Sequence, residues 1–194
     1  KSTPPANAFV NKFSLQKKQK LYPLELFFCN ECSHVQLLDV VEPSELFEEY
    51  VYVSGTSPLF IKHFENYCNY IIEKFNPSSH EIIVDIGSND GTLLSFFKAK
   101  GYSVLGIDPA KQIALQANKK GIKTINDFFT INVAQEILKS HSKASVITAN
   151  NVFAHADDLI EITKAVKQLL SPEGIFVFEV SYLVDVLEKT LFDT

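Results

Sequence analysis

The sequence predicts an α/β protein built on an open, parallel, Rossmann-like sheet. From residue 81 onward, short apolar runs alternate with amphipathic helical segments. The first apolar run passes through a glycine-flanked turn straight into a helical segment, as in a βαβ unit. The chain has 194 residues, of which 46% are hydrophobic and 21% charged, so it can bury a full core in one or two domains.

Residues 1–42 are expected to form a small β-rich module. They show no long helical period and carry Pro4, Pro5 and Pro23 among short apolar stretches. Cys29 and Cys32 have the spacing of half a structural zinc site, which needs four ligands. We therefore predict a partial zinc-binding module here. The third cysteine, Cys68, falls on an apolar helix face and is predicted to belong to the core.

Residues 43–80 are expected to form a helical linker or lid. A short helix begins near Pro43, and a loop or strand containing Gly55 follows it. A longer helix begins after Ser57, because serine is a favoured N-cap and proline follows at the first helical position. Apolar residues then recur at helical spacing until Asn76-Pro77 ends the segment.

Residues 81–194 are expected to form the Rossmann-like domain. Thr130 and Asp157 stand where helix N-caps are needed. A further helix is expected from Leu183, and the sheet then stops early, which indicates a truncated domain. The predicted strands are 82–86, 103–107, 122–125, 144–149 and 175–180, and the predicted helices are 91–100, 109–120, 131–140 and 157–170.

The segment IIVDIGSNDG at 82–91 indicates a nucleoside-binding turn. Gly87 and Gly91 lack a Cβ, so backbone amides are expected to approach a ligand at the helix N-terminus. Asp108 ends the next strand about twenty residues later, where an acid binds ribose hydroxyls in a βαβ unit. The alternative is that the glycines only make a tight turn and the acids only cap helices.

The identity of the nucleoside is indicated by two missing glycines. A dinucleotide fingerprint would need glycine where Asn89 and Thr92 stand, so a pyrophosphate would fit poorly. Asp85, at the end of the first strand, adds a carboxylate that favours a cationic ligand bearing an amino acid. These features point to S-adenosylmethionine.

Other candidate residues follow the later strands. Asp127 can accept the adenine amino group and Phe128 can flank the ring, although core packing is an equal alternative for Phe128. Asn150 and Asn151 open the loop after the fourth strand and could contact the methionine moiety or a substrate, although asparagine also suits such a turn. His155, in the same loop, could bind a keto oxygen or assist a base; alternatively, it caps the next helix.

Composition limits the range of partners. The formal charge is −5 and the pI near 5.5, and no basic cluster is present, which argues against nucleic acid. All 18 basic residues are lysines. The sequence shows no apolar run of membrane-spanning length and no signal-peptide core, so we expect no membrane partner and a cytoplasmic location. The oligomeric state is not predicted.

Several segments together resemble the sugar C-methyltransferases that act on nucleotide-linked ketosugars. The resemblance covers essentially the whole chain, and VDIGSNDGTLL followed by NNVFAHADDL is its most specific pair. The segments that carry it are PANAF at 5–9, YPLELFFCNECSHVQL at 22–37, ELFEEYVYVSGTS at 45–57, VDIGSNDGTLL at 84–94, GIDPA at 106–110 and NNVFAHADDL at 150–159.

The resemblance implies a Rossmann-like class I S-adenosylmethionine-dependent methyltransferase domain with a structural zinc module, acting on a nucleoside-diphosphate-linked 4-keto-deoxysugar. It implies catalytic or acceptor-side roles for His155, Asn151 and Tyr52, with Tyr52 in a lid, and zinc ligation by Cys29 and Cys32. The cofactor-binding set is Asp85, Gly87, Asn89, Asp90, Gly91, Asp108, Pro109, Asp127, Phe128 and Asn150.

Two departures from the family pattern limit the expectation. Family members carry a first cysteine pair before the PANAF segment and a Tyr-His-Glu-His motif just after FDT, and this sequence contains neither. We therefore expect half a zinc site and a chain that is inactive alone. The alternatives are a small-molecule O- or N-methyltransferase and a noncatalytic module that binds S-adenosylmethionine or a partner.

Overall fold

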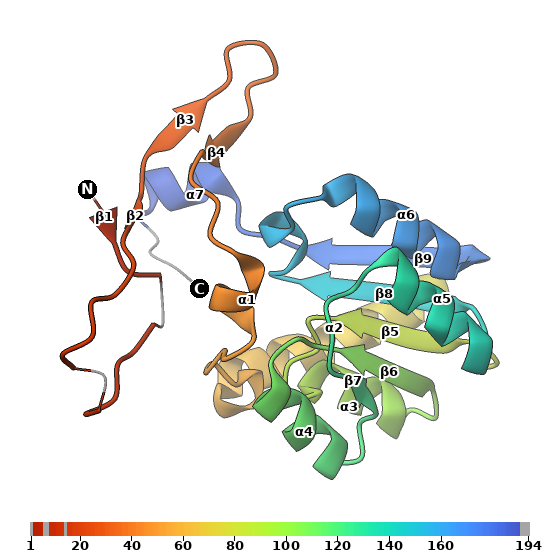
Figure 1. Cartoon of the computed structure of the whole chain (residues 1–194). Helices are drawn as coiled ribbons and strands as arrows, with labels where there is room; N and C mark the ends of the chain where they lie inside the picture. The colour runs from red at the N-terminus through yellow and green to blue at the C-terminus, as the bar shows by residue number, and fades with distance from the viewer. Residues whose placement is uncertain (1, 6–7, 14, 191–194) are drawn as a thin grey trace. The chain divides into compact units, whose positions relative to one another are not determined.

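A computed structural model describes residues 2–5, 8–13 and 15–190 of the chain (Figure 1). The chain forms two compact units, Lys1–Tyr52 and Val53–Thr194, and each is described by itself. The division at 1–42, 43–80 and 81–194 remains a prediction. Part of the PANAF segment, residues 6–7, and the end of the C-terminal helical pattern, residues 191–194, lie outside the described residues.

The first unit is a set of short strands with one short helix. β3 and β4 pair antiparallel as a hairpin, with Phe28 opposite Val35, and the two cysteines lie in its turn. β1 and β2 form a second antiparallel pair. The elements are β1 (Ser2–Thr3), β2 (Tyr22–Pro23), β3 (Leu26–Phe28), β4 (Val35–Leu37) and α1 (Pro43–Phe47).

The second unit holds a five-stranded parallel sheet in the order β7-β6-β5-β8-β9. This arrangement confirms the predicted fold class. The strands are β5 (Ile82–Ile86), β6 (Ser103–Ile107), β7 (Thr124–Ile125), β8 (Ala144–Asn150) and β9 (Leu170–Glu179). The helices are η1 (Ser54–Thr56), α2 (Pro58–Phe75), α3 (Thr92–Ala99), α4 (Lys111–Lys119), α5 (Ile131–Ser140), η2 (Phe153–His155), α6 (Leu159–Leu169) and α7 (Leu183–Glu188).

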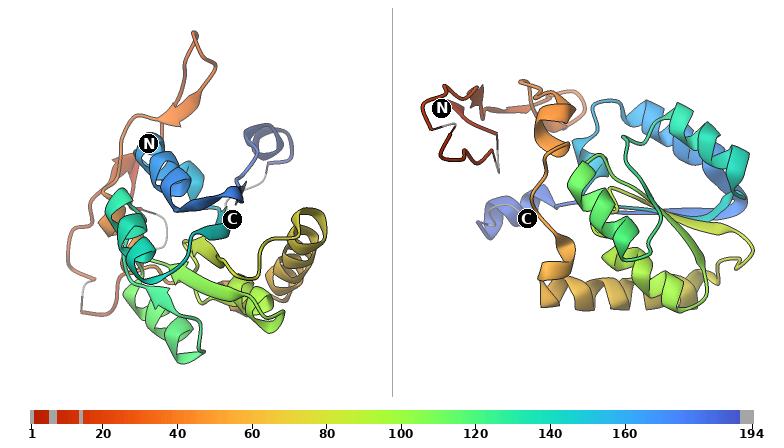
Figure 2. Two further views of the ribbon diagram at one scale, coloured as in Figure 1. Left: turned by 90° about the vertical axis from the view of Figure 1, so that its right-hand side faces the viewer. Right: turned by 60° about the horizontal axis from the view of Figure 1, so that its bottom comes forward.

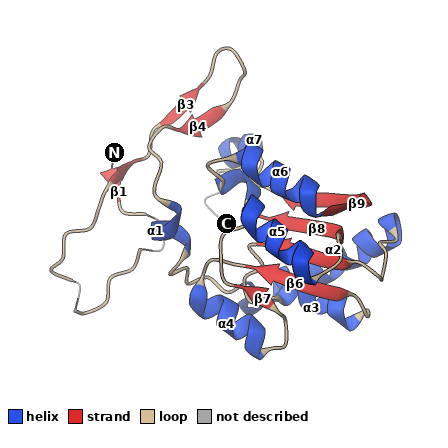
Figure 3. Ribbon diagram, turned by 45° about the vertical axis from the view of Figure 1, so that its right-hand side comes forward, coloured by secondary structure: helices blue, strands red, loops and turns tan. Residues whose placement is uncertain are grey.

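Helices cover both faces of the sheet, and the alternate side chains of β5 pack against both helical layers. Its side chains alternate between faces: Val84 packs with α5 and α6, whereas Ile83 packs with α2 and α3. Because both faces are buried, every residue of β5 is buried and the strand reads as a continuous apolar run broken only by Asp85. Figures 2 and 3 show the sheet between these two helical layers.

The strand order places a ligand edge at the carboxyl ends of β5, β6 and β8. β5 pairs with β6 on one side and β8 on the other, so the chain reverses its direction of travel across the sheet at β5. In open α/β sheets, ligands bind outside the carboxyl ends of the strands at such a switch point. The turn predicted to bind a nucleoside leaves β5 at this point.

Several element boundaries differ from the predictions, and three of the differences have a local cause. β7 begins at Thr124 rather than 122, because the Ile122 amide donates to Ala117 at the end of α4. α6 is capped by Asp158, whose carboxylate accepts from the Glu161 amide (2.8 Å), so Asp157 is not the cap. β9 begins at Leu170 rather than 175, and the extra residues form a bulge opposite β8.

Other predicted starts are confirmed. Ser57 caps α2 by accepting from the Phe60 amide, with Pro58 at the first helical position, and Thr130 caps α5 by accepting from Val133. Cys68 is fully buried in the core, as predicted. No helix within the described ranges is long and apolar enough to cross a membrane.

The turn from β5 into α3 requires a glycine at its last residue. Gly91 has φ +78°, and a Cβ there would lie 2.9 Å from Ile122 side-chain atoms. Gly101 has φ +90°, but a Cβ there would meet open space. Both alanine variants incur left-handed strain of about 1–2 kcal/mol, and only Gly91→Ala adds overpacking of about 1–3 kcal/mol.

We therefore predict that Gly91→Ala lowers the free energy of unfolding more than Gly101→Ala. Urea denaturation of both variants measures the difference. Equal losses would show that packing against Ile122 does not constrain the turn.

Candidate cofactor site

The backbone amides of the glycine-flanked turn are all bonded within the protein. Gly87 and Ser88 donate to the Ile107 carbonyl (2.8 and 3.1 Å), and Gly91 donates to Ser88 (3.0 Å). The three other amides of residues 87–92 donate to side chains: Asn89 to Asp108, Asp90 to Asn89, and Thr92 to Asp90. The expectation that these amides reach toward a ligand is thus not what the structure shows. The turn offers no ready anion cradle.

Asp108 connects two loops at the ligand edge. Its Oδ2 accepts from the Asn89 amide and its Oδ1 from the Ala110 amide, both at 2.8 Å. The side chain therefore fixes both the turn after β5 and the start of α4. Burial raises the pKa of Asp108, although these two hydrogen bonds oppose the rise. Each carboxylate oxygen keeps a lone pair for a further donor.

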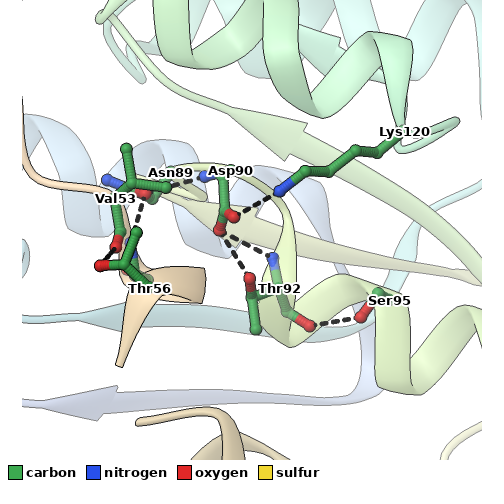
Figure 4. Close-up of polar contacts among 8 residues, drawn as sticks. Val53, Thr56, Asn89, Asp90, Thr92, Ser95 and Lys120 are labelled. Carbon is green, nitrogen blue, oxygen red and sulfur yellow. Dashed lines mark hydrogen bonds and ion pairs between the residues drawn. The ribbon is translucent and has the colours of Figure 1, made fainter. Parts of the chain in front are cut away.

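Asp90 is buried and held by neighbours on both sides (Figure 4). Its Oδ1 accepts from the Thr92 hydroxyl (2.6 Å), and its Oδ2 forms an ion pair with Lys120 (2.6 Å). Burial raises the pKa of Asp90, but the Lys120 and Thr92 contacts outweigh it and the pKa lies below its ordinary value. The structure gives Asp90 a role in fixing the turn, and direct cofactor contact remains a prediction.

Asn89 joins the turn to η1. Its Oδ1 accepts from the Ser54 amide and from the Asp90 amide, both at 2.9 Å, and its backbone is left-handed (φ 49°). Gly55 then approaches Asp90 so closely that a Cβ would lie 2.4 Å from Oδ2. The segment after Tyr52 is therefore tied directly to the turn, as Figure 4 shows for Val53 and Thr56 beside Asn89.

The loops after β6 and β7 meet through Asn126. Its side-chain amide donates to the carbonyls of Asp108 (3.0 Å) and Pro109 (2.8 Å). Next to it, Asp127 is exposed, Phe128 is half-buried, and Phe129 is buried in the core. Asp127 and Phe128 thus remain accessible for the predicted contacts with adenine.

Asp85 is a buried carboxyl at the end of β5. The Thr148 hydroxyl donates to its Oδ1 at 2.6 Å. Burial raises the pKa of Asp85 to about 7; the Thr148 bond opposes the rise, and the neighbouring Asp108 charge adds to it. Burial therefore disfavours the charged form of Asp85, and a nearby cation would favour it.

The loop after β8 carries the predicted acceptor-side residues. Asn150 ends the strand. The backbone of Asn151 is left-handed (φ 54°), a conformation that asparagine adopts more readily than most residues, so backbone geometry alone can explain an asparagine at this position. His155 ends η2 and is exposed. Tyr52 belongs to the first unit, so its predicted place beside these residues remains a prediction.

Four residues of this site were not identified from the sequence. Lys120 and Asn126 fix the loops, and Ser88 has a buried hydroxyl without a hydrogen-bond partner among the described residues. Tyr67 of α2 also has a buried, unpartnered hydroxyl, next to Asn150. Of these four residues, only Tyr67 could have been suspected from the sequence, because it places a hydroxyl on the apolar face of a predicted helix.

The cysteine pair forms a tight turn at the tip of the β3–β4 hairpin. The Cys29 amide donates to the His34 carbonyl, and Ser33 donates to the Cys29 carbonyl, both at 2.8 Å. Amides of Cys32 and Glu31 hydrogen-bond the Cys29 sulfur and lower its pKa. Thiolate character suits a metal ligand, but no group of three or more His, Cys, Asp or Glu placed to hold a metal occurs among the described residues.

Comparisons with known proteins place the chain in a family. Residues 60–194 match the family described as Methyltransferase domain, and residues 1–47 match a family described as a zinc binding domain. The C-methyltransferase NovU of Streptomyces niveus is 35% identical over 193 residues, covering 100% of this chain and 46% of NovU. An O-methyltransferase of ubiquinone biosynthesis from Vibrio cholerae is 24% identical over 57% of the chain and 46% of its own length.

Solved structures agree on the fold. The plantazolicin methyltransferase BpumL, in complex with a desmethylPZN analog and SAH, superposes with a TM-score of 0.56 at 17% identity, covering 71% of this chain and 54% of that one. An S-adenosylmethionine-dependent methyltransferase from Clostridium acetobutylicum gives 0.52 at 20% identity, covering 66% and 54%. The second unit thus has the fold of these methyltransferases.

The chain belongs to the family described as Methyltransferase domain, and its 35% identity to the C-methyltransferase NovU supports the family resemblance seen in the sequence. It spans about half the length of the curated relatives it matches, 46% of each.

The residues present fit S-adenosylmethionine. A turn whose amides are all bonded suits a nucleoside without phosphates, and Asp85 and Asp108 supply buried carboxylates at the carboxyl ends of β5 and β6. Asn150 adds a buried amide with no hydrogen-bond partner among the described residues. These groups together provide acceptors for a cationic nucleoside.

We predict that Asp85→Asn stabilises the chain at high pH more than at low pH. The pKa of Asp85 is raised in the folded state to about 7, from about 3.9 when unfolded. The stability contributed by protonated Asp85 is therefore complete below about pH 4 and is lost as pH rises to about 7, by up to about 1.4 kcal/mol per unit. Asparagine cannot ionise, and its amide oxygen can still accept from Thr148.

Urea denaturation at pH 5 and pH 8 tests this prediction, with the exposed Asp157→Asn as the matched control. The stability gained by Asp85→Asn should be larger at pH 8. A gain that is the same at both pH values would contradict a raised pKa at Asp85.

Proposed function

We propose that this chain is the cofactor-binding part of an S-adenosylmethionine-dependent C-methyltransferase that acts on a nucleoside-diphosphate-linked 4-keto-deoxysugar. The observation that carries the proposal is the edge built by Asp108, Asp85 and the fully bonded turn at 87–92, together with 35% identity to a C-methyltransferase along the chain. The sugar substrate and a cytoplasmic location come from the sequence alone.

The proposed cofactor contacts divide along the edge of the sheet. Asp108 binds the ribose hydroxyls, and Asp127 and Phe128 contact the adenine. Asp85 and Asn150 face the methionine moiety and its positive charge. Gly87, Asn89, Asp90, Gly91 and Pro109 hold the loops in the shape that these contacts need.

When bound, the cofactor supplies an electrophilic methyl group. Displacement at that methyl needs alignment with the acceptor and exclusion of water, but no protein nucleophile. A carbon acceptor also needs a base to remove the proton next to the ketone, and a group to stabilise the oxygen that becomes negative. We assign His155, with Asn151, to the oxygen or to assistance of the base, and Tyr52 to the lid over the acceptor.

A second candidate is O-methylation, favoured by the match to the O-methyltransferase of Vibrio cholerae. It would need no removal of a proton from carbon. The two functions therefore differ in whether the substrate exchanges hydrogen with solvent at the carbon next to the ketone.

We predict that a protein of the relatives' full length transfers a labelled methyl group to carbon of a nucleotide-linked 4-ketosugar. His155→Ala should reduce turnover at least tenfold, since general acid–base groups contribute about 10²–10⁴-fold, and should change cofactor affinity little. His80→Ala, which removes a histidine just before β5 at the opposite edge, is the matched control. NMR of the product locates the methyl group.

Incubation in deuterated water should also show exchange at the carbon next to the ketone, and His155→Ala should slow this exchange if it assists the base. Transfer of the label to oxygen, without exchange at carbon, would overturn C-methylation and support the second candidate.

We also propose that Cys29 and Cys32 supply two of the four ligands of a structural zinc in a longer protein with an upstream cysteine pair. The tight turn and the amides that bond the Cys29 sulfur support this assignment. Such a protein should contain close to one zinc per chain, and Cys29→Ser should lower that content while Cys68→Ala, in the core, should not. Elemental analysis that finds no zinc in protein never exposed to chelators would rule out the site.

A further inference from the structure

Glu179, the last residue of β9, carries a carboxylate that none of the proposed contacts uses. Side chains of β9 alternate between the two helical layers, and Ile175 and Val177 pack on the α2 side, so Glu179 continues that face. His63 of α2 bonds this carboxylate, with its Nε2 2.8 Å from Oε2. The two residues are 116 positions apart in the sequence. A histidine–glutamate pair therefore joins α2 to β9 at the carboxyl end of the sheet.

The pair is ordered on one side and open on the other. A carboxylate only accepts hydrogen bonds, so the hydrogen of this contact belongs to His63 Nε2. The imidazole packs among the rings of Phe60, Phe64 and Tyr67, with centroids 5.7–6.4 Å away. The side chains of His63 and Glu179 are 44% and 35% exposed. Glu179 Oε1 has no hydrogen bond to any described residue, so an oriented oxygen remains for a ligand.

The end of β9 is also joined to the loop that carries the proposed acceptor-side residues. The Asn151 amide donates to the Glu179 carbonyl at 2.8 Å. On the other face of the strand, the Phe178 ring lies 5.0 Å from that of Phe153 in η2, measured between centroids. η2 ends at His155. Glu179 therefore belongs to the same end of the sheet as the residues assigned to the ketone.

The strand order separates Glu179 from the proposed cofactor contacts. The proposed ribose anchor follows β6, and β5, β8 and β9 come next across the sheet. Neighbouring strands are about 4.8 Å apart, so the end of β9 lies about 14 Å from that of β6. Asp85 and Asn150, on β5 and β8, face the methionine moiety in the proposed arrangement. The next strand end beyond them is that of β9, and an acceptor on this side of the cofactor meets Glu179.

The charge of the carboxylate selects a neutral part of the acceptor. It repels a diphosphate, whereas its oxygens form strong hydrogen bonds with hydroxyl groups. We propose that Glu179 binds a ring hydroxyl of the acceptor sugar through Oε1, and that His63 is the positioning residue that holds the carboxylate. The sugar ring, rather than the diphosphate, then faces β9. The assignment rests on the proposed nucleotide-linked sugar substrate and names the group that recognises its ring.

Steady-state kinetics with a nucleotide-linked 4-keto-deoxysugar tests the assignment in a protein of the relatives' full length. Glu179→Gln replaces a charge-assisted hydrogen bond by a neutral one and should raise KM for the sugar about tenfold or more. The bond exists before and during methyl transfer, so kcat should change little. His63→Ala should also raise KM. His63→Gln should restore most of this loss, because its amide can donate to Glu179 in place of Nε2.

A matched control breaks another ion pair of the same helix. Lys62 and Glu65 of α2 are 2.8 Å apart and exposed, and Glu65→Gln should change neither KM nor kcat. Calorimetric titration should show unchanged affinity for S-adenosylhomocysteine in the Glu179 and His63 variants. Their melting temperatures should change little, because a partly exposed ion pair contributes little to stability.

A series of sugars that each lack one ring hydroxyl identifies the bonded group. For the sugar without that hydroxyl, Glu179→Gln should leave KM unchanged, because the bond is already absent. Equal sensitivity of every sugar to Glu179→Gln would overturn the assignment. A loss of affinity for S-adenosylhomocysteine would also overturn it, since the pair would then serve the cofactor.

Two further outcomes separate this assignment from the proposed function. Methyl transfer to the ketosugar with an unchanged KM in Glu179→Gln would contradict the assignment alone. If the unaltered full-length protein methylated no ketosugar, the proposed function would be wrong, and this assignment with it.

Discussion

The Asp108 carboxylate is the constraint on which the ligand edge depends. It accepts one hydrogen bond from the turn after β5 and another from the first residues of α4, so two loops that only the sheet brings together share one side chain. Asn126 extends this connection to the loop after β7. Three consecutive strand ends are thus held in register by side chains as well as by the sheet. A ribose bound there would meet a framework that is already assembled, which lowers the ordering cost of binding.

The way the turn uses its amides separates this site from phosphate-binding versions of the same fold. In those, amides at a helix N-terminus remain available for an anion. Here the amides of residues 87–92 are bonded to carbonyls and to the side chains of Asn89, Asp90 and Asp108. Asp85 adds a third buried acid. The edge is therefore organised around acceptors, and a ligand with positive charge and hydroxyl groups is its electrostatic complement.

Most of the fold could be predicted because strand and helix periods are local signals. β5, β6 and α5 begin and end at the predicted residues. The predicted β9 began too late, because Ser171-Pro172-Glu173-Gly174 has the composition of a turn but forms a bulge within the strand. The residue types of the site were also visible in the sequence. What the sequence could not show was how the acids and amides of the turn pair with one another. Tyr67 was missed for the same reason, since only the packed sheet brings α2 beside Asn150.

Asn89 connects the proposed ribose anchor, Asp108, to η1 at the start of the second unit. Its backbone N–H bonds Asp108, and its side-chain oxygen bonds the Ser54 N–H. A ligand bound through the remaining lone pairs of Asp108 would therefore lie two hydrogen bonds from the segment leading into α2. That segment carries no predicted cofactor contact of its own, yet Asn89 joins it to the proposed ribose anchor. Amide exchange at Ser54 would be a local gauge of whether nucleoside is bound.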